Sequence, residues 1–410
     1  MKKVSIVAPN TLEKGFEVNL PSSKSIANRL LIIQALAGGE MDIHELSEAD
    51  DTQLLQYLLN SDLSEFNTKN AGTVFRFLTA YLCLQKGRFL LTGSDRMMNR
   101  PIGPLVDALR SLWAQIDYAG AEGFPPVRIT GSELSGSSIE IPGEVSSQFV
   151  SALMLIGPYV RGGIELILAQ QQVSRSYIHM TYLLMKEAGA GIEISENIIT
   201  VQEGKYQAGQ YEVEKDWSSA HFWMQLSAQY SRSQLILVGL KNSGLQGDEQ
   251  VAKYFEKLGI SAVSCTAGIE LQNIQKSASC DPEFDLSSTP DAFPALACTA
   301  AALGRRTGFT GIHHLQYKES DRLEAVINEL GKVGVVFEQG ADTLTLKKGL
   351  KSGGNPEFNT YDDHRLAMAF ALLAPKFESV TVVNPEVVIK SYPSFWTELK
   401  KAGFSLDFKS

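Results

Sequence analysis

The 410-residue sequence has none of the features that mark membrane, secreted or disordered chains. No apolar run reaches the roughly 20 residues of a membrane-spanning helix. Only about five weakly apolar residues precede Pro9 in MKKVSIVAPN, too few for a signal-peptide core. We therefore expect a cytoplasmic protein without a membrane span. The composition, 44% apolar and 20% charged, is typical of globular domains, and the length favours two of them.

Cysteine and histidine are scarce and follow no metal-binding pattern. The cysteines form no CxxC pair and the six histidines no HExxH motif, so no metal site is expected. In a reducing compartment the four cysteines should be buried apolar residues: Cys83, Cys265, Cys280 and Cys298. GxGxxG is absent, and SSKS has Ser23 where a P-loop needs glycine, so ATP or NAD use is unsupported.

An excess of positive charge is missing as well. The chain has 37 Lys and Arg against 46 Asp and Glu, a net charge of −9. This argues against binding of nucleic acid or of anionic membrane surfaces. It leaves room for a locally positive cleft, because basic residues are present in number.

What the chain does contain is a unit repeated six times. In each unit a small polar cluster opens an almost wholly apolar helix, and an amphipathic helix follows roughly thirty residues later. The apolar helices open near Ser22, Asn70, Ser146, Asp216, Ser288 and Asp362. The amphipathic helices open near Asp51, Pro101, Tyr177, Glu249, Asp321 and Pro393.

The repeat predicts an α+β fold of two similar domains, each built from three βαβαββ units. Helices that are apolar on every side should be buried, with the sheets outside them. Short alternating runs bounded by glycine predict strands: RFLLTG, PVRITG and SIEIPG in the second unit, GGIELILA and AGIEISENIITVQ in the third. The polar stretch GKYQAGQYEVEKDWSS is a candidate crossover between the domains.

Basic residues recur at the openings of these helices, where they oppose the helix dipole at about 0.3–1 kcal/mol each. A bound anion would reverse that cost. The cations at the apolar helices are Lys24, Arg29, Arg76 and Arg365. Those at the amphipathic helices are Arg96, Arg100, Lys318, Arg322 and Lys390. Each alone is more often a solvated charge, but their recurrence at matching positions favours a site for several phosphate and carboxylate groups.

Two carboxylates lie within this cationic pattern. Asp291 in STPDAF and Glu319 in KESDR could divide general-acid and general-base roles. Asp362 and Asp321 are explained equally well as helix caps.

Seven motifs in order resemble those of the EPSP synthases, the 3-phosphoshikimate 1-carboxyvinyltransferases, almost end to end. They are SKSxxNR, NAGT, DRMxxRPI, the SSQ triplet at Ser146, PDA at Asp291, KExDRL and DHRxAM. The resemblance implies the inside-out α/β-prism fold of enolpyruvyl transferases. One domain would comprise residues 1–20 and 214–410, the other residues 21–213, with the active site in the cleft between them.

The resemblance also implies an activity. The enolpyruvyl group of phosphoenolpyruvate (PEP) would pass to the 5-hydroxyl of 3-phosphoshikimate through a tetrahedral intermediate, with release of phosphate. This reaction serves the shikimate pathway to chorismate and the aromatic amino acids, and its enzymes are the target of glyphosate. The family uses no metal or organic cofactor, and we expect a monomer.

The resemblance assigns roles to individual residues. For catalysis it implies Asp291, Glu319, Lys318 and Lys24. For 3-phosphoshikimate it implies Ser25, Arg29, Ser146, Ser147, Ser174, Tyr177, Asp291, His314 and Lys318. For PEP it implies Lys24, Asn70, Gly72, Arg100, Gln148, Arg322, Arg365 and Lys390, with backbone at Ala71 close by.

Four positions depart from the family pattern. Ser22 replaces a glycine before Lys24, Lys69 a glycine before NAGT, and Phe77 a proline behind Gly72. His314 stands where an asparagine often contacts the shikimate phosphate, and its hydrogen bonding could depend on pH.

Two alternatives remain at this point. The sister enzyme that uses UDP-N-acetylglucosamine shares the fold but carries a cysteine loop near DRMMNRP, where this chain has none between Cys83 and Cys265. A catalytically inactive anion-binding homologue would have lost charged residues that are all present here.

Overall fold

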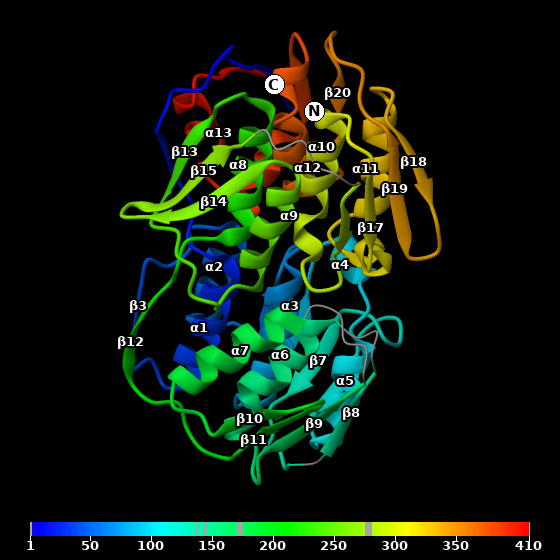
Figure 1. Cartoon of the computed structure of the whole chain (residues 1–410). Coiled ribbons are helices and arrows are strands. Elements are labelled where there is room, and N and C mark those ends of the chain that lie inside the picture. Colours follow the sequence, from blue (N-terminus) through cyan, green and yellow to red (C-terminus); the bar gives the residue numbers. More distant parts are fainter. Residues whose placement is uncertain (1, 137, 143–145, 170–174, 275–280, 410) are drawn as a thin grey trace. The chain divides into compact units, whose positions relative to one another are not determined.

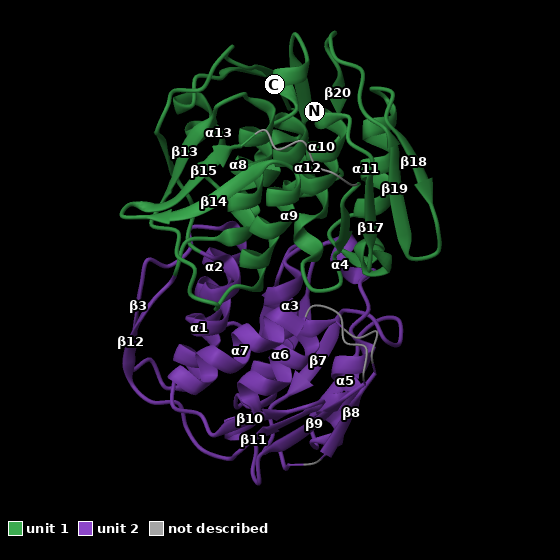
Figure 2. Ribbon diagram, in the orientation of Figure 1, with its two compact units in different colours: residues 1–22, 214–410 green, residues 23–213 purple. Residues whose placement is uncertain are grey.

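The structure is a computed structural model that describes residues 2–136, 138–142, 146–169, 175–274 and 281–409. The chain divides into two compact units (Figure 2). Unit 1 comprises Met1–Ser22 and Glu214–Ser410, and unit 2 comprises Ser23–Val213. Ser174 and Cys280 lie outside the described residues.

Three buried helices form the centre of each unit (Figure 1). In unit 2 they are α1 (Lys24–Leu36), α3 (Gly72–Cys83) and α6 (Ser147–Ile156), which pack against one another. In unit 1 they are α8 (Trp217–Gln229), α10 (Phe293–Leu303) and α12 (His364–Ala371), which do the same. In α8 every residue from Trp217 to Ala228 is buried. Helices apolar on all sides are thus interior, as the sequence predicted.

The amphipathic helices of the repeat are also present. They are α2 (Asp50–Leu59), α5 (Gly103–Ser111), α7 (Arg175–Glu187), α9 (Val251–Lys257), α11 (Arg322–Gly331) and α13 (Phe395–Lys401), with a short additional α4 (Asp95–Met98). Asp321 caps α11 by accepting a hydrogen bond from Glu324 N, which confirms its predicted role.

Unit 2 has two four-stranded sheets. The first has the order β4 (Glu65–Asn67), β5 (Arg88–Thr92), β7 (Val127–Thr130), β6 (Gln115–Tyr118). The second has the order β10 (Ile192–Ser195), β11 (Ile198–Val201), β9 (Ile164–Leu168), β8 (Ser138–Ile141). The expectation that SIEIPG closes the second repeat is wrong: as β8 it pairs in parallel with β9 and opens the third.

The first repeat differs from the others in its sheet. Among the described residues this sheet has two strands, β3 (Met41–His44) and β12 (Gly209–Glu212), paired in parallel. β12 lies within the candidate crossover, so the crossover segment completes unit 2 before the chain leaves it.

Unit 1 has three four-stranded sheets, and two of them use strands from the start of the chain. Their orders are β14-β15-β13-β2, β16-β17-β19-β18 and β20-β21-β1-β22. The strands are β1 (Lys3–Val7), β2 (Phe16–Asn19), β13 (Gln234–Val238), β14 (Ile260–Cys265), β15 (Gly268–Asn273), β16 (Glu283–Asp285), β17 (Thr307–Thr310), β18 (Val336–Gln339), β19 (Thr343–Lys348), β20 (Glu357–Phe358), β21 (Val380–Val383) and β22 (Ser405–Lys409). The central helices thus have sheets outside them, which confirms the predicted α+β class.

The cysteines follow expectation only in part. Cys83 and Cys298 are buried thiols with raised pKa values, because burial disfavours the thiolate. Cys265, at the end of β14, is exposed, so the prediction of burial is wrong there. Within the described residues no cluster of His, Cys, Asp and Glu could hold a metal ion. None of the helices described is both long and apolar enough to span a membrane.

Candidate active site

In unit 1 a single guanidinium gathers three carboxylates. Arg322, the first residue of α11, is only 1% exposed. Its Nη1 donates to Asp291 Oδ1 at 2.7 Å, its Nη2 to Glu319 Oε2 at 2.6 Å and its Nε to Asp363 Oδ2 at 2.7 Å. The other oxygen of Asp291 accepts from Arg365 Nη2 at 2.9 Å. Such charge-assisted bonds fix the orientation of every group in the cluster.

This arrangement keeps Asp291 ionised. Burial by itself would favour the neutral acid, but the positive charges of Arg365, Arg322 and Lys318 outweigh it and hold the pKa of Asp291 well below its usual range. Asp291 lies in a short 3-10 turn, Pro290–Ala292, directly before α10. A carboxylate with both oxygens bound to arginines is therefore presented at the start of a buried helix.

Lys318 and His314 belong to the same electrostatic group. Burial, with Arg322 and Arg365, lowers the pKa of Lys318, while Asp291 and Glu319 oppose the change. Burial and the charge of Lys318 lower the pKa of His314 to about 3. The imidazole is consequently neutral near pH 7, so the predicted pH dependence of its hydrogen bonding would fall in the acid range.

A short turn before α12 places the remaining residues of unit 1. Asp363, and not Asp362, caps α12, because its Oδ1 accepts from Arg365 N at 2.9 Å. Asp362 has a φ of +55° and instead contacts Lys390: its carbonyl oxygen accepts from Lys390 Nζ at 3.3 Å. The suggested capping role of Asp362 is thus wrong, and the turn connects two predicted PEP ligands, Arg365 and Lys390.

In unit 2 the buried Arg29 is surrounded by neutral partners. Its Nε donates to Thr181 Oγ1 at 2.7 Å, and its two other nitrogens donate to Ser25 O, Ser151 Oγ and Tyr177 O. Its guanidinium also lies 5.5 Å from the ring centroid of Phe77 and 5.9 Å from that of Tyr177. Burial lowers the pKa of Arg29 to about 10, against the opposing influence of Tyr177. Phe77, the departure from proline, therefore contacts a predicted site residue.

Two further arginines converge on the start of α3. A Cβ at Gly72 would clash with the guanidinium of Arg76 and lie 2.5 Å from Arg100 Nη1, so both guanidinium groups would have to move to admit a side chain there. Arg76 Nη1 donates to Gln148 Oε1 at 2.9 Å, and Gln148 Nε2 donates to Thr73 Oγ1 at 3.1 Å. Three predicted PEP residues of unit 2, Gly72, Arg100 and Gln148, are thereby linked through α3.

The other predicted residues of unit 2 open helices. Lys24 begins α1, and its Nζ lies 3.0 Å from Asp51 Oδ2 in a largely buried ion pair. Ser146 caps α6, of which Ser147 is the first residue. The buried Oδ1 of Asn70, just before α3, accepts no hydrogen bond from the residues that the structure describes. Ser174 lies in residues 170–174, outside the described part.

Two partners of the predicted residues were not themselves assigned to the site: Asp51 holds Lys24, and Asp363 holds Arg322. Arg76, which holds Gln148, was already noted among the cations at helix openings. Asp51 and Asp363 stand in the first turn or the cap of a helix, where an acidic residue needs no other explanation. The paired cation of each is distant in the sequence, so no local pattern revealed these pairs.

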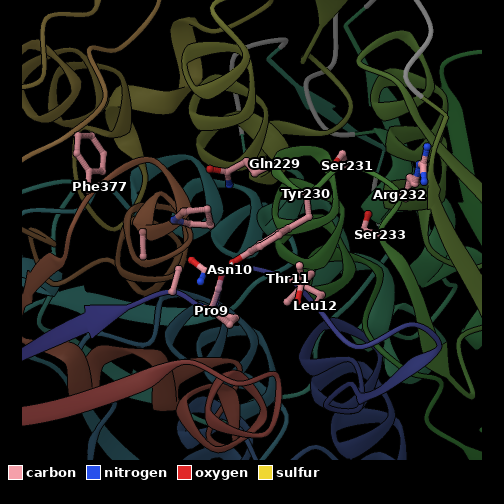
Figure 3. A pocket seen from close by; sticks show the side chains of 13 residues that line it. Pro9, Asn10, Thr11, Leu12, Gln229, Tyr230, Ser231, Arg232, Ser233 and Phe377 are labelled. Atoms are coloured by element: carbon pink, nitrogen blue, oxygen red, sulfur yellow. The ribbon is translucent and has the colours of Figure 1, made fainter.

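A separate pocket of about 390 Å³ lies in unit 1 away from these clusters (Figure 3). It is lined by residues 8–12 and 229–233, together with Ala374, Pro375 and Phe377. None of these residues belongs to the predicted site. A site for several phosphate and carboxylate groups requires charged side chains that converge. The Arg322 cluster has them, and it is therefore a better candidate site than this pocket.

The fold defines the class of protein to which the chain is similar. Over the full chain it matches an EPSP synthase of Acinetobacter baumannii with a TM-score of 0.79 at 23% identity, covering all of both chains. It matches the enolpyruvyl transferase NikO of Streptomyces tendae with a TM-score of 0.77 at 15% identity, covering 100% of this chain and 99% of the other. The architecture is that of the enolpyruvyl transferases.

The sequence comparisons go further than the class. A family model described as EPSP synthase (3-phosphoshikimate 1-carboxyvinyltransferase) matches residues 59–399. A 3-phosphoshikimate 1-carboxyvinyltransferase of Bacteroides fragilis is 41% identical over 95% of each chain. One of Sulfurovum is 36% identical over 94% of this chain and 96% of its own. The chain belongs to the EPSP synthase family.

Proposed function

We propose that this chain is a 3-phosphoshikimate 1-carboxyvinyltransferase (EC 2.5.1.19), which transfers the enolpyruvyl group of PEP to the 5-hydroxyl of 3-phosphoshikimate. The family membership supports the reaction. The observation that carries it is the cluster around Arg322: an ionised Asp291, a second carboxylate, a lysine and two arginines in one place. Its place in metabolism is then the shikimate pathway to chorismate and the aromatic amino acids.

The reaction requires one addition and one elimination. In the addition, the 5-oxygen bonds to C2 of PEP, Asp291 takes the hydroxyl proton, and C3 gains a proton from the Lys318–Glu319 pair. In the elimination, the C2–O bond to phosphate breaks, C3 returns its proton to the same pair, and the departing phosphate takes up the proton that Asp291 had accepted, which restores the Asp291 carboxylate. Lys24, Arg100, Gln148 and Lys390 would stabilise the departing phosphate, because cations and N–H donors offset its developing charge.

Substrate binding itself can prepare Asp291 for this role. Arg322 and Arg365 hold both of its oxygens and keep its pKa low, which makes it a weak base. The PEP carboxylate is expected at the same two arginines and would compete for their N–H groups. Weaker pairing with the arginines would raise the pKa of Asp291 towards that of an effective proton acceptor.

The second substrate is assigned mainly to unit 2. Ser25, Arg29, Ser146, Ser147, Ser174 and Tyr177 would bind 3-phosphoshikimate together with Asp291, His314 and Lys318. We propose that both units contribute residues to one active site, that no cofactor takes part, and that the protein works as a cytoplasmic monomer. The neutral imidazole of His314 can donate one hydrogen bond to a phosphate oxygen, as the usual asparagine does.

Phosphate release with purified protein tests the proposal. Release should require both PEP and 3-phosphoshikimate, and mass spectrometry should find the enolpyruvyl product. Release with UDP-N-acetylglucosamine in place of 3-phosphoshikimate would reassign the enzyme to its sister activity. Binding of both ligands without release would identify an inactive homologue. The same assay with glyphosate measures the effect of Phe77 behind Gly72.

A further inference from the structure

The turn at Thr360–Asp363 has an unfavourable backbone conformation. Asp363 N donates to Thr360 O at 2.8 Å, and the two central residues have φ values of +51° (Tyr361) and +55° (Asp362). Positive φ at both central positions is the pattern of a type I′ turn, which glycine and asparagine favour. A tyrosine there is an outlier, so surrounding contacts must hold this conformation.

The buried side chain of Glu329 makes the contacts that hold this conformation. Only 1% of the residue is exposed. Its Oε1 accepts from the Tyr361 hydroxyl at 2.9 Å, and its Oε2 accepts from Asn359 N at 2.9 Å and from Lys332 Nζ. The carboxylate thus binds the backbone before the turn and the side chain of its first central residue. Hydrogen bonds to an ionised acceptor are stronger than neutral ones, so this attachment is firm.

Helix α11 contacts the 360–363 turn through two side chains. Arg322 and Glu329 are seven residues apart on α11, about 10 Å along one face of the helix. Arg322 binds Asp363 at the end of the turn, and Glu329 binds Asn359 and Tyr361 at its beginning. Because an α-helix is stiff over two turns, α11 sets the span and direction of the segment between them.

The 360–363 turn also orients two predicted anion-binding residues of unit 1, Arg365 and Lys390. Asp363 caps α12 and so places Arg365, while the carbonyl oxygen of Asp362 accepts from Lys390. Asp362 Oδ1 also accepts from Asn384 Nδ2 at 3.2 Å, which ties the turn to the segment before Lys390. A shift of the turn would therefore move Arg365 and Lys390 and loosen Arg322.

We propose that Glu329 and the Tyr361 hydroxyl form a positioning pair that holds the strained 360–363 turn, and through it the three cations of unit 1 that meet PEP. Glu329 touches no substrate in this proposal, which rests on the proposed function. It acts on PEP through Arg322, Arg365 and Lys390. The turn belongs to unit 1, whereas the residues assigned to 3-phosphoshikimate belong mainly to unit 2.

Tyr361→Phe is the primary test, because it removes one hydroxyl from a side chain that is 44% exposed and should leave folding intact. We expect kcat/KM for PEP to fall about tenfold, mostly through KM, while KM for 3-phosphoshikimate changes less than about twofold. Tyr230→Phe is the matched control in unit 1, since the Tyr230 hydroxyl donates to Pro9 O and not to the turn. It should leave both KM values unchanged.

Glu329→Gln completes a double-mutant cycle. If both groups act through one contact, the double variant should show no larger loss than the more affected single variant. An unchanged KM for PEP in Tyr361→Phe, or equal changes in both KM values, would overturn the positioning role while leaving the enzyme active. Loss of the proposed function would show differently, as a wild-type protein without phosphate release.

Discussion

Two buried arginines, Arg322 in unit 1 and Arg29 in unit 2, have their positive charges balanced by different kinds of neighbour. Arg322 in unit 1 is 1% exposed and meets three carboxylates, which outweigh burial and raise its pKa well above the usual value. Arg29 in unit 2 is 2% exposed and meets hydroxyls, carbonyls and aromatic rings. No carboxylate pairs with Arg29 among the described residues, and its pKa falls to about 10.

The difference indicates different roles for the same side chain. The charge of Arg322 is already compensated by three carboxylates, so it fixes the orientation of Asp291 and Glu319, the groups to which we assign proton transfer. The charge of Arg29 is balanced only by dipoles and ring faces, which stabilise a buried cation less completely than a carboxylate does. An anionic ligand near Arg29 would therefore gain more from it. Unit 1 is suited to proton transfer, and unit 2 to recognition of a phosphate-bearing partner.

The largest effect should follow Arg322→Met. Three carboxylates would lose their shared cation, and breaking a buried ion pair in this way costs about 3–5 kcal/mol of unfolding free energy. Urea denaturation measures this loss, and turnover should disappear. Arg306→Met is the matched control, since Arg306 pairs with Asp281 at an exposed position and its loss should cost less than about 0.5 kcal/mol. Equal costs for the two variants would contradict the central place of Arg322.

Asp291→Asn should have the next largest effect. It keeps the shape but removes the proton acceptor, so turnover should fall by about 10²–10⁴-fold. Because the folded pKa of Asp291 is depressed, its stabilising contribution is present above the unfolded value of about 4 and is lost on acidification. The gap in unfolding free energy between wild type and variant should accordingly shrink below pH 4. Near-normal turnover in a folded variant would remove Asp291 from the mechanism.

Arg29→Met tests the other side of the comparison. Methionine fills much of the same volume and removes a charge that no carboxylate in the described part of the chain balances. We therefore expect a smaller loss than for Arg322→Met, about 1–2 kcal/mol. Calorimetry should show 3-phosphoshikimate binding weakened by about tenfold to a hundredfold. If the variant were as unstable as Arg322→Met, the two arginines would not differ in the way described.

His314→Asn should have the smallest effect near pH 7, and a measurable effect only in acid. The folded pKa of His314 is about 3, against about 6.5 when unfolded, so the unfolded chain binds a proton that the folded chain does not between these values. Wild type therefore loses stability as pH falls from 6.5 to 4. The variant should lose about 1–3 kcal/mol less over this range, as measured by urea unfolding at each pH. Parallel curves would mean that His314 is protonated in the folded protein.

Much of the fold was predictable because the distribution of apolar residues around a helix indicates how deeply that helix is buried. The all-apolar stretches became α1, α3, α6, α8, α10 and α12, and the striped ones became the outer helices. Strand pairing was less accessible. SIEIPG pairs with a parallel strand 27 residues later, with Ser138 opposite Glu165, and nothing in its own residues indicates the partner. Nor did any local signal show that the sheet of the first repeat has two strands within the described residues.

The candidate site was also predictable only in part. Cations at helix openings pointed to Lys24, Arg322 and Arg365, because a cation there is unfavourable without a partner. Asp291 was found as a carboxylate within this cationic pattern. The partners themselves, Asp51 and Asp363, were hidden among ordinary capping residues. The clamp of Glu329 on Tyr361 was hidden as well, since a glutamate within an amphipathic helix is normally solvated. Residues that orient other residues leave little trace in a single sequence.

The place of β1 within its sheet has a consequence for synthesis of the protein. Residues 3–7 pair on one side with Val380–Val383 and on the other with Ser405–Lys409. β1 is synthesised long before both of these strands and must therefore wait for its partners. Unit 2 ends at Val213, so all of its residues are available for folding while translation continues. Until residues 380–409 are made, both edges of β1 remain unpaired and are open to aggregation.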